Sequence, residues 1–207
     1  MWGLVESGSI TKIISKPKGL VIGDVRHSRK IFELWSKAEL EAIGIYEVEF
    51  NNTNKKNEKW YINTDQSFAF AGGKITASYG TATARAHADT DDVDDDGNKV
   101  KDADGNQVVT EGLKTKLIRE VKKQAAEILQ DTDWYIVRKA DAGTAVPSSI
   151  TNHRAAVRTK AAEMETSITN ASDTPALETL YTYVNTADEG DPVVIKRPLG
   201  ELPKLES

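Results

Sequence analysis

The chain changes its residue pattern across an acidic segment near its middle, and this change limits the folds open to it. Residues 84–111 hold eight aspartates between Asp89 and Asp104 and few apolar side chains. Residues 1–83 carry most of the aromatic and β-branched residues, whereas the part after the acidic segment is rich in Ala, Lys, Glu and Leu. An alternating apolar pattern favours strands, and apolar residues every three to four positions favour helices. The sequence therefore predicts an α+β protein with its strands and helices in separate halves.

Residues 1–83 are predicted to form a small, mostly β domain with one short helix. Two glycine-containing turns, at Ser7–Gly8 and Gly72–Gly73, lie between apolar segments. They indicate hairpins, because glycine adopts the positive φ that tight turns require. The stretch Ser36–Glu39 has the pattern of a capping box and predicts a helix that starts there and ends by Gly44.

The acidic segment, residues 84–111, contains the tripeptide Asp-Gly-Asn twice, at Asp96–Asn98 and at Asp104–Asn106. Asp-Gly pairs favour tight turns, which predicts an exposed hairpin. The polar composition favours a flexible linker to the same degree. Turn chemistry alone leaves both interpretations open.

Part of the same segment matches the first half of a calcium-binding loop. Asp92, Asp94 and Asp96 alternate and are followed by Gly97, a spacing that can place carboxylate oxygens around one ion. Position twelve of such a loop supplies a bidentate glutamate, but counting from Asp92 it is Ala103. A solvated acidic loop is therefore the favoured interpretation, and we expect neither a metal nor a cofactor.

Residues 112–185 are predicted to form a helical domain that packs as a compact antiparallel bundle. Pro147 suits the start of a helix, where its missing N–H costs little. Residues 186–207 have little apolar content and are expected to form an extended tail. Four apolar stripes with helical spacing support the bundle: Leu113, Leu117, Val121, Ala125 and Ile128; Trp134, Ile136 and Val137; Ile150, Val157, Ala161, Met164 and Ile168; and Leu177, Leu180, Tyr181 and Val184.

Composition argues against several classes of protein. The chain has no cysteine, which excludes a disulfide framework and thiolate metal sites. Its net charge of -5, without an uninterrupted basic cluster, disfavours nucleic-acid binding. No apolar run approaches the roughly 18 residues that span a bilayer, so we expect no membrane insertion.

Motifs of catalysis are also missing from the sequence. It contains no nucleophile elbow, Walker loop or dinucleotide fingerprint, so we predict no catalytic residues and no enzyme. His27, His87 and His153 are far apart and have no ligand-spaced partners, which leaves a zinc site without support. His27 and His153 are expected at the surface.

The stretch Thr132–Arg158 contains Asp133-Trp134, Pro147, Arg154 and Arg158 in the order T-D-W-Y-I-V-R-K-A-D-A-G-T-A-V-P-S-S-I-T-N-H-R-A-A-V-R. It resembles the C-terminal helical module of bacteriophage tail proteins, the tail-assembly-chaperone-like group that is often appended to tail-fibre polypeptides. The sequence L-W-S-K-A-E-L-E-A-I-G-I-Y at Leu34–Tyr46 more weakly resembles the opening module of phage virion proteins.

The resemblance implies a non-enzymatic structural protein of the phage tail or tail-fibre apparatus. Such a protein would be made in the host cytoplasm, reside in the virion, and act through contacts with other tail or fibre proteins or with further copies of itself. A tail-fibre assembly chaperone is the first alternative. A glycan-binding or calcium-binding receptor module is the second, and it rests on the Trp and Tyr content and on the aspartate run.

Four residues are candidates for contact with a partner: Trp134, Tyr135, Arg154 and Arg158. Trp134 has two interpretations. It is either a plug between the first two helices, with Tyr135 pointing outward, or part of a docking surface, because Trp, Tyr and Arg dominate interface hot spots.

The two arginines also have two interpretations. Arg154 and Arg158 lie four residues apart and so share one face of a helix, which suits a docking surface. Alternatively, they form a salt bridge with Asp133 or Asp131 and orient the junction between two helices. The sequence allows both roles together.

Overall fold

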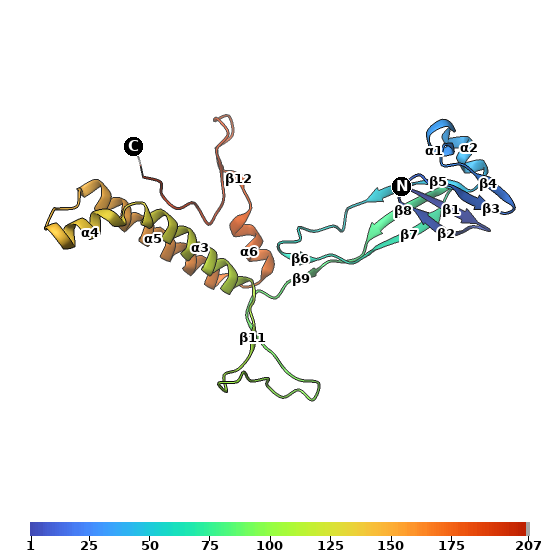
Figure 1. Cartoon of the computed structure of the whole chain (residues 1–207). Coiled ribbons are helices and arrows are strands. Elements are labelled where there is room, and N and C mark those ends of the chain that lie inside the picture. The colour runs from blue at the N-terminus through green and yellow to red at the C-terminus, as the bar shows by residue number, and fades with distance from the viewer. Residues whose placement is uncertain (206–207) are drawn as a thin grey trace. The chain divides into compact units, whose positions relative to one another are not determined.

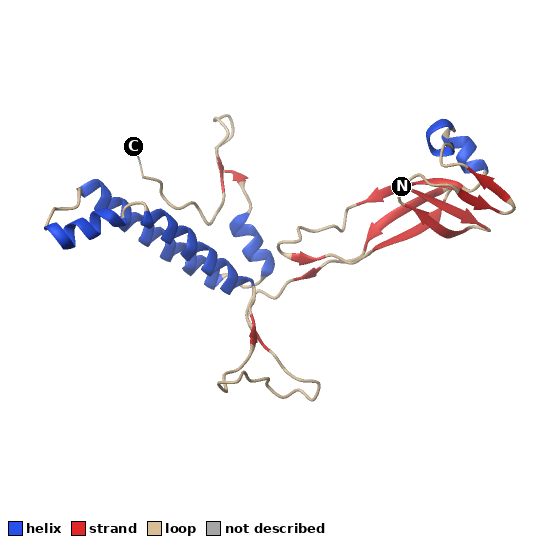
Figure 2. Ribbon diagram, viewed as in Figure 1, coloured by secondary structure: helices blue, strands red, loops and turns tan. Residues whose placement is uncertain are grey.

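The structure is a computed structural model that describes residues 1–205, and the chain forms two compact units (Figure 1). The first unit is Met1–Thr83 and the second is Ala84–Ser207. Strands predominate in the first unit and helices in the second, as Figure 2 shows. The predicted α+β class, with segregated strands and helices, is confirmed.

A five-stranded sheet organises the first unit. Its strand order is β2-β1-β5-β8-β7, and only the β5–β8 pair is parallel. The two edge strands, β2 and β7, approach each other, so the sheet is strongly curved. The strands are β1 (Trp2–Glu6), β2 (Ser9–Ile14), β5 (Ile45–Asn51), β7 (Gln66–Ala71) and β8 (Lys74–Tyr79), with short pairs β3 (Leu20–Ile22) with β4 (Val25–His27) and β6 (Tyr61–Ile62) with β9 (Thr83–Ala84).

Both predicted hairpin turns of this unit are confirmed. Ser7 and Gly8 connect β1 to β2 with φ values of 51° and 77°, and Gly72 and Gly73 connect β7 to β8 with φ values of 59° and 74°. Positive φ at both central residues gives a turn whose twist matches that of the flanking strands. The register of these strands is therefore set locally.

The capping box is also confirmed, although the prediction of a single helix is wrong. Ser36 Oγ accepts a hydrogen bond from the Glu39 backbone N–H, and the Glu39 carboxylate accepts one from the Ser36 backbone N–H at 2.7 Å. These bonds start α2 (Lys37–Ala42). A further helical turn, α1 (Ile31–Leu34), precedes it because the apolar run there buries Ile31 against the sheet.

The first unit has two clusters of buried side chains. One cluster is covered by α1 and α2, and Trp2 and Phe32 pack against it. The other is formed by β5 and β8, where Phe68 and Phe70 cover its margin. The buried members are Leu4, Ile14, Leu20, Ile31, Leu40 and Ile45 in the first cluster and Val48, Ile75 and Ala77 in the second.

The acidic segment adopts the hairpin interpretation and not the linker interpretation. Its stem is β10 (Thr90–Asp91) paired with β11 (Val109–Thr110). Beyond the stem, three backbone hydrogen bonds of 2.9 Å form a ring, in which the N–H groups of Asp92, Val100 and Val108 donate to the carbonyls of Val108, Asp92 and Val100. Since these residues are eight apart, the ring joins the stem to two similar loops.

Each loop is closed by an aspartate side chain. Asp94 Oδ1 accepts hydrogen bonds from the backbone N–H groups of Asp96 and Asn98. Asp102 repeats this arrangement with Asp104 and Asn106, at the same distances of 3.0 and 2.8 Å. The carboxylates thus bind the backbone of their own turns, as Asp and Asn side chains do in Asx turns.

Two long antiparallel helices, α3 (Leu113–Gln130) and α5 (Ser148–Asn170), form the core of the second unit. Lys114 near the start of α3 donates to the Thr169 carbonyl at the end of α5, and Lys122 pairs with Glu165. The predicted apolar stripes are confirmed as the buried faces. They are Leu113, Leu117, Val121 and Ala125 on α3 and Ile150, Val157, Ala161, Met164 and Ile168 on α5.

The compact four-helix bundle is not confirmed. The short helix α6 (Thr174–Tyr181) buries Thr174 and Leu177. In contrast, α4 (Asp133–Ala142) has no buried residue. Its apolar side chains pack into no core, so α4 (hereafter the arm) lies uncovered at one end of the α3–α5 pair (Figure 1).

The start of α3 is completed by a segment from earlier in the chain. The N–H groups of Leu113 and Lys114 donate to the carbonyls of Ala86 and His87. The Asp89 carboxylate accepts from the Gly112 N–H at 2.7 Å and from the Thr115 hydroxyl at 2.8 Å. These bonds satisfy donors that a helix leaves unpaired at its N-terminus.

The predicted tail is partly structured. Val184 does not belong to a fourth helical stripe but lies in β12 (Val184–Asn185), which pairs with β13 (Ile195–Lys196). Leu199 is buried, and its N–H donates to the carbonyl of Leu180. The tail thus contributes one buried side chain, and the bond to Leu180 holds this part of it against the end of α6.

Candidate protein-contact site

Trp134 lies on the exposed arm α4 and is 51% exposed, so the prediction of a buried plug is wrong. Its ring stacks on Tyr135 with a centroid distance of 3.8 Å. The guanidinium of Arg138 lies over both rings, 4.6 Å from the Trp134 centroid and 5.4 Å from that of Tyr135. The three side chains form a preformed aromatic–cationic platform on the helix.

The rest of α4 adds apolar surface to this platform. Val137 is 65% exposed, and Ile136 is also exposed. The helix ends at Gly143, whose φ of 68° gives a left-handed C-cap. An amphipathic helix normally buries its apolar residues, so α4 presents an apolar surface that the described part of its own chain does not cover.

Arg154 is not part of this exposed surface, which corrects its prediction as a partner contact. It is only 7% exposed. One of its terminal nitrogens donates to the Leu129 carbonyl at 2.7 Å and to the Thr132 hydroxyl at 2.6 Å. The other pairs with Asp133 at 2.8 Å. The predicted salt bridge to Asp133 is thus confirmed.

Arg158 is exposed, although it lies one turn from Arg154. Over residues 1–205, it forms no ion pair with Asp131 or Asp133. The prediction that Arg154 and Arg158 have the same role is therefore wrong. Arg154 donates to the Leu129 carbonyl at the end of α3, whereas Arg158 lies one turn further along α5.

His153 is buried beside this junction, so its predicted surface position is wrong. It lies between the last turn of α3 and the segment Pro203–Leu205. His27 is partly exposed and its ring contacts Trp35 edge-on at 5.7 Å.

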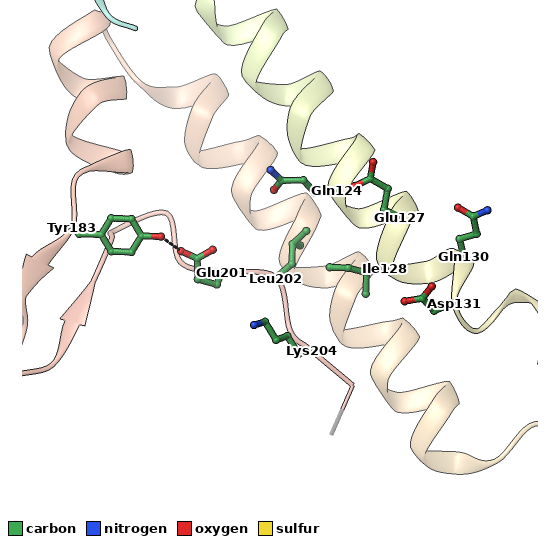
Figure 3. A pocket seen from close by; sticks show the side chains of 9 residues that line it. All are labelled: Gln124, Glu127, Ile128, Gln130, Asp131, Tyr183, Glu201, Leu202 and Lys204. Carbon is green, nitrogen blue, oxygen red and sulfur yellow. Dashed lines mark hydrogen bonds between the residues drawn. The ribbon is translucent and has the colours of Figure 1, made fainter. Parts of the chain in front are cut away.

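A groove of about 800 Å³ lies between the end of α3 and the C-terminal segment, and both line it (Figure 3). Ile128 and Leu202 supply its apolar floor, and Tyr183 donates from its hydroxyl to Glu201 at 2.6 Å. This bond raises the pKa of Tyr183, because the neighbouring carboxylate disfavours the phenolate. The remaining lining residues are polar: Gln124, Glu127, Gln130, Asp131 and Lys204.

Sequence reasoning missed Arg138 and this groove. Arg138 had a usable signal, because its four-residue spacing from Trp134 places both on one helical face. The groove had none, since Tyr183 and Leu202 meet the end of α3 only in the folded chain.

The partial calcium motif is not arranged as an ion site. Asp94 is occupied by its own turn, and Asp92 accepts a hydrogen bond from the Thr110 hydroxyl. Throughout residues 1–205, no three His, Asp or Glu side chains are grouped to hold a metal ion.

Within the same range, no helix combines the length and the apolar character needed to cross a bilayer.

Comparison with known proteins identifies no relative. No family model, no curated protein and no solved structure matches the chain.

Proposed function

We propose that this chain is a non-enzymatic structural protein of a bacteriophage tail or tail-fibre apparatus and that it works through protein–protein contacts made by α4. The observation that carries the contact role is the uncovered arm, on which Trp134, Val137 and Arg138 are gathered without a buried face. Tryptophan and arginine are the residues most enriched at interface hot spots.

The phage assignment rests on the sequence resemblance over Thr132–Arg158. In this proposal, the arm binds another tail or fibre protein or a further copy of this chain, and the chain stays in the virion after its synthesis in the host cytoplasm. The buried Arg154 holds the base of the arm through Asp133 and Thr132 and so acts as a positioning residue. An arm held at its base loses less conformational freedom when it binds.

Mass spectrometry of purified particles tests the virion assignment. We expect peptides of this chain at a fixed ratio to the other tail proteins. Their absence from particles that assemble in cells expressing the chain would contradict a structural role.

A tail-fibre assembly chaperone is a second candidate, because an exposed apolar arm also suits transient capping of an apolar fibre tip. Co-expression with the fibre protein separates the two functions. A structural subunit remains bound to the purified fibre in a fixed ratio. A chaperone raises the yield of soluble fibre and is then lost on purification.

A further inference from the structure

We infer that two copies of this chain form a symmetric dimer in which α4 of each copy docks in the groove of the other. The groove is the one lined by the end of α3 and by Tyr183 and Glu201–Lys204. The inference deepens the proposed function, on which it rests for the role of α4 as a contact surface. Its basis is the match between the arm and the groove in apolar character and in charge.

The groove is apolar at its floor and acidic at its rim. Ile128 and Leu202 form the floor, and Glu127, Asp131 and Glu201 outnumber the single cation, Lys204 (Figure 3). Glu201 is already paired with Arg197 at 2.7 Å, and Glu127 is paired more loosely with Lys123 at 3.9 Å. Asp131 has no hydrogen bond or ion pair from its side chain to the rest of residues 1–205. Asp131 is therefore the rim carboxylate whose negative charge a basic partner can neutralise.

The arm carries the complementary groups. Trp134 and Val137 are three residues apart and supply apolar area, and Arg138 and Lys139 supply two positive charges. Neither cation forms an ion pair within residues 1–205. A carboxylate on a second molecule can accept hydrogen bonds from the terminal nitrogens of Arg138.

The arm does not fill the groove of its own chain, because a short and fixed connection separates them. Only Asp131 and Thr132 lie between α3 and α4, and Arg154 bonds to Leu129 on the α3 side of this junction and to Asp133 on the α4 side. Docking in a second copy removes this restriction. Since the arm and the groove both lie at the end of α3, one two-fold axis there makes the arm–groove contact twice.

The size of the surface suits a dimer. The arm has 10 residues, and 9 residues line the groove. A standard interface uses about 20–30 residues on each partner. In the symmetric dimer each copy contributes both its 10 arm residues and its 9 groove residues, which together come close to that number.

Sedimentation equilibrium of the full chain tests the inference. We expect a monomer–dimer equilibrium, with a dimer Kd that Val137→Asp raises at least about tenfold. Val193→Asp is the matched control, because Val193 is 70% exposed in the loop between β12 and β13 and lies outside both regions. It should leave Kd unchanged. Circular dichroism of each variant verifies that α3 and α5 remain folded.

Charge reversal supplies the decisive pair of variants. An arm variant, Arg138→Glu with Lys139→Glu, and a groove variant, Glu127→Lys with Asp131→Lys, should each be monomeric where the unmodified chain is dimeric. Mixing them should restore a dimer that contains one copy of each, because both of its interfaces then join opposite charges.

A chain that stays monomeric at every concentration, or a dimer that responds equally to Val137→Asp and Val193→Asp, would overturn the inference. Failure of the mixed variants to associate would do the same. These results concern only the purified chain. The presence of the chain in virions is measured separately. The dimer can therefore be disproved while the structural role stands, and the structural role can be disproved while the dimer stands.

Discussion

Arg154 is the residue that connects the core of the second unit to its exposed arm. Its guanidinium lies at the end of α3, where it donates to the Leu129 carbonyl and to the Thr132 hydroxyl. The ion pair with Asp133 adds less, since Asp133 is half-exposed and water screens the pair. The stabilising part of the arrangement is therefore the buried pair of hydrogen bonds.

Replacement of Arg154 should consequently lower stability more than replacement of its neighbour one turn away. We expect Arg154→Ala to reduce the free energy of unfolding by about 1.5–3 kcal/mol, because buried acceptors lose bonds to a charged donor. Arg158→Ala is the control at an exposed site and should change it by less than about 0.5 kcal/mol. Urea denaturation followed by circular dichroism measures both. Equal effects would contradict the positioning role.

At the scale of the element, the start of α3 depends on close approach of a distant backbone segment. Gly112 has no side chain to cap the helix, and its N–H donates to Asp89. A Cβ atom at position 112 would lie 2.3 Å from the carbonyl of Ala88. The segment that caps α3 can reach it only because residue 112 is glycine.

The substitution Gly112→Ala should therefore displace the capping segment. We expect a loss of about 1–3 kcal/mol, typical of overpacking in a tight site. Gly19→Ala is the control, because its Cβ would meet only a carbonyl oxygen at 3.5 Å, an ordinary contact. Hydrogen exchange at the Leu113 and Lys114 amides should accelerate in Gly112→Ala alone. Unchanged protection there would contradict this account of the helix start.

The two loops of the acidic hairpin should depend on pH in a defined direction. Bonds from the Asn98 and Asn106 backbone N–H groups, with smaller contributions from other groups in each turn, hold the pKa values of Asp94 and Asp102 below that of an ordinary aspartate. A carboxyl whose folded pKa is depressed stabilises the fold above its unfolded pKa, near 3.9, and loses this contribution as pH falls through the folded value. The loops should therefore stay ordered at neutral pH and loosen in acid below pH ~4.

NMR titration of the Gly97 and Gly105 amides measures this loosening, since both glycines lie inside the two turns. Asp94→Asn keeps an acceptor oxygen without the titrating charge, so the amide of Gly97 should then lose its response to the carboxyl while that of Gly105 keeps it. A response of Gly97 in the variant equal to that in the unmodified chain would show that Asp94 does not control the turn.

Local sequence patterns predicted the helices and turns well. The burial of single residues could not be predicted from them, because it depends on contacts that form only in the folded chain. The Ser7–Gly8 turn and the capping box at Ser36 involve bonds within four residues, so the sequence determines them. The apolar spacing of Trp134 predicts a helix correctly but does not reveal whether another element covers it. Arg154 and Leu199 are buried by residues more than 18 positions away, which no local pattern reports.

At the scale of the whole molecule, each of the two compact units has its own buried residues. Ile75 lies in a cluster of strand residues of Met1–Thr83, and Val157 lies on the α5 face that packs against α3 in the second unit. Both side chains are fully buried. Large-to-small changes at such positions remove packing that the surroundings only partly replace.

The two units should therefore lose stability one at a time. Ile75→Ala should lower the free energy of unfolding of the first unit by about 2–5 kcal/mol, and Val157→Ala should destabilise the second unit. Each effect should be confined to one unit, because the shortened side chain packs within that unit. Hydrogen exchange of the full chain, followed by mass spectrometry of its peptides, distinguishes the units. Ile75→Ala should expose the amides of β5 and β8 and leave those of α3 and α5 protected, and Val157→Ala should do the reverse. If either substitution opened both units together, the chain would unfold as one cooperative body, and cores confined to separate units would not account for its stability.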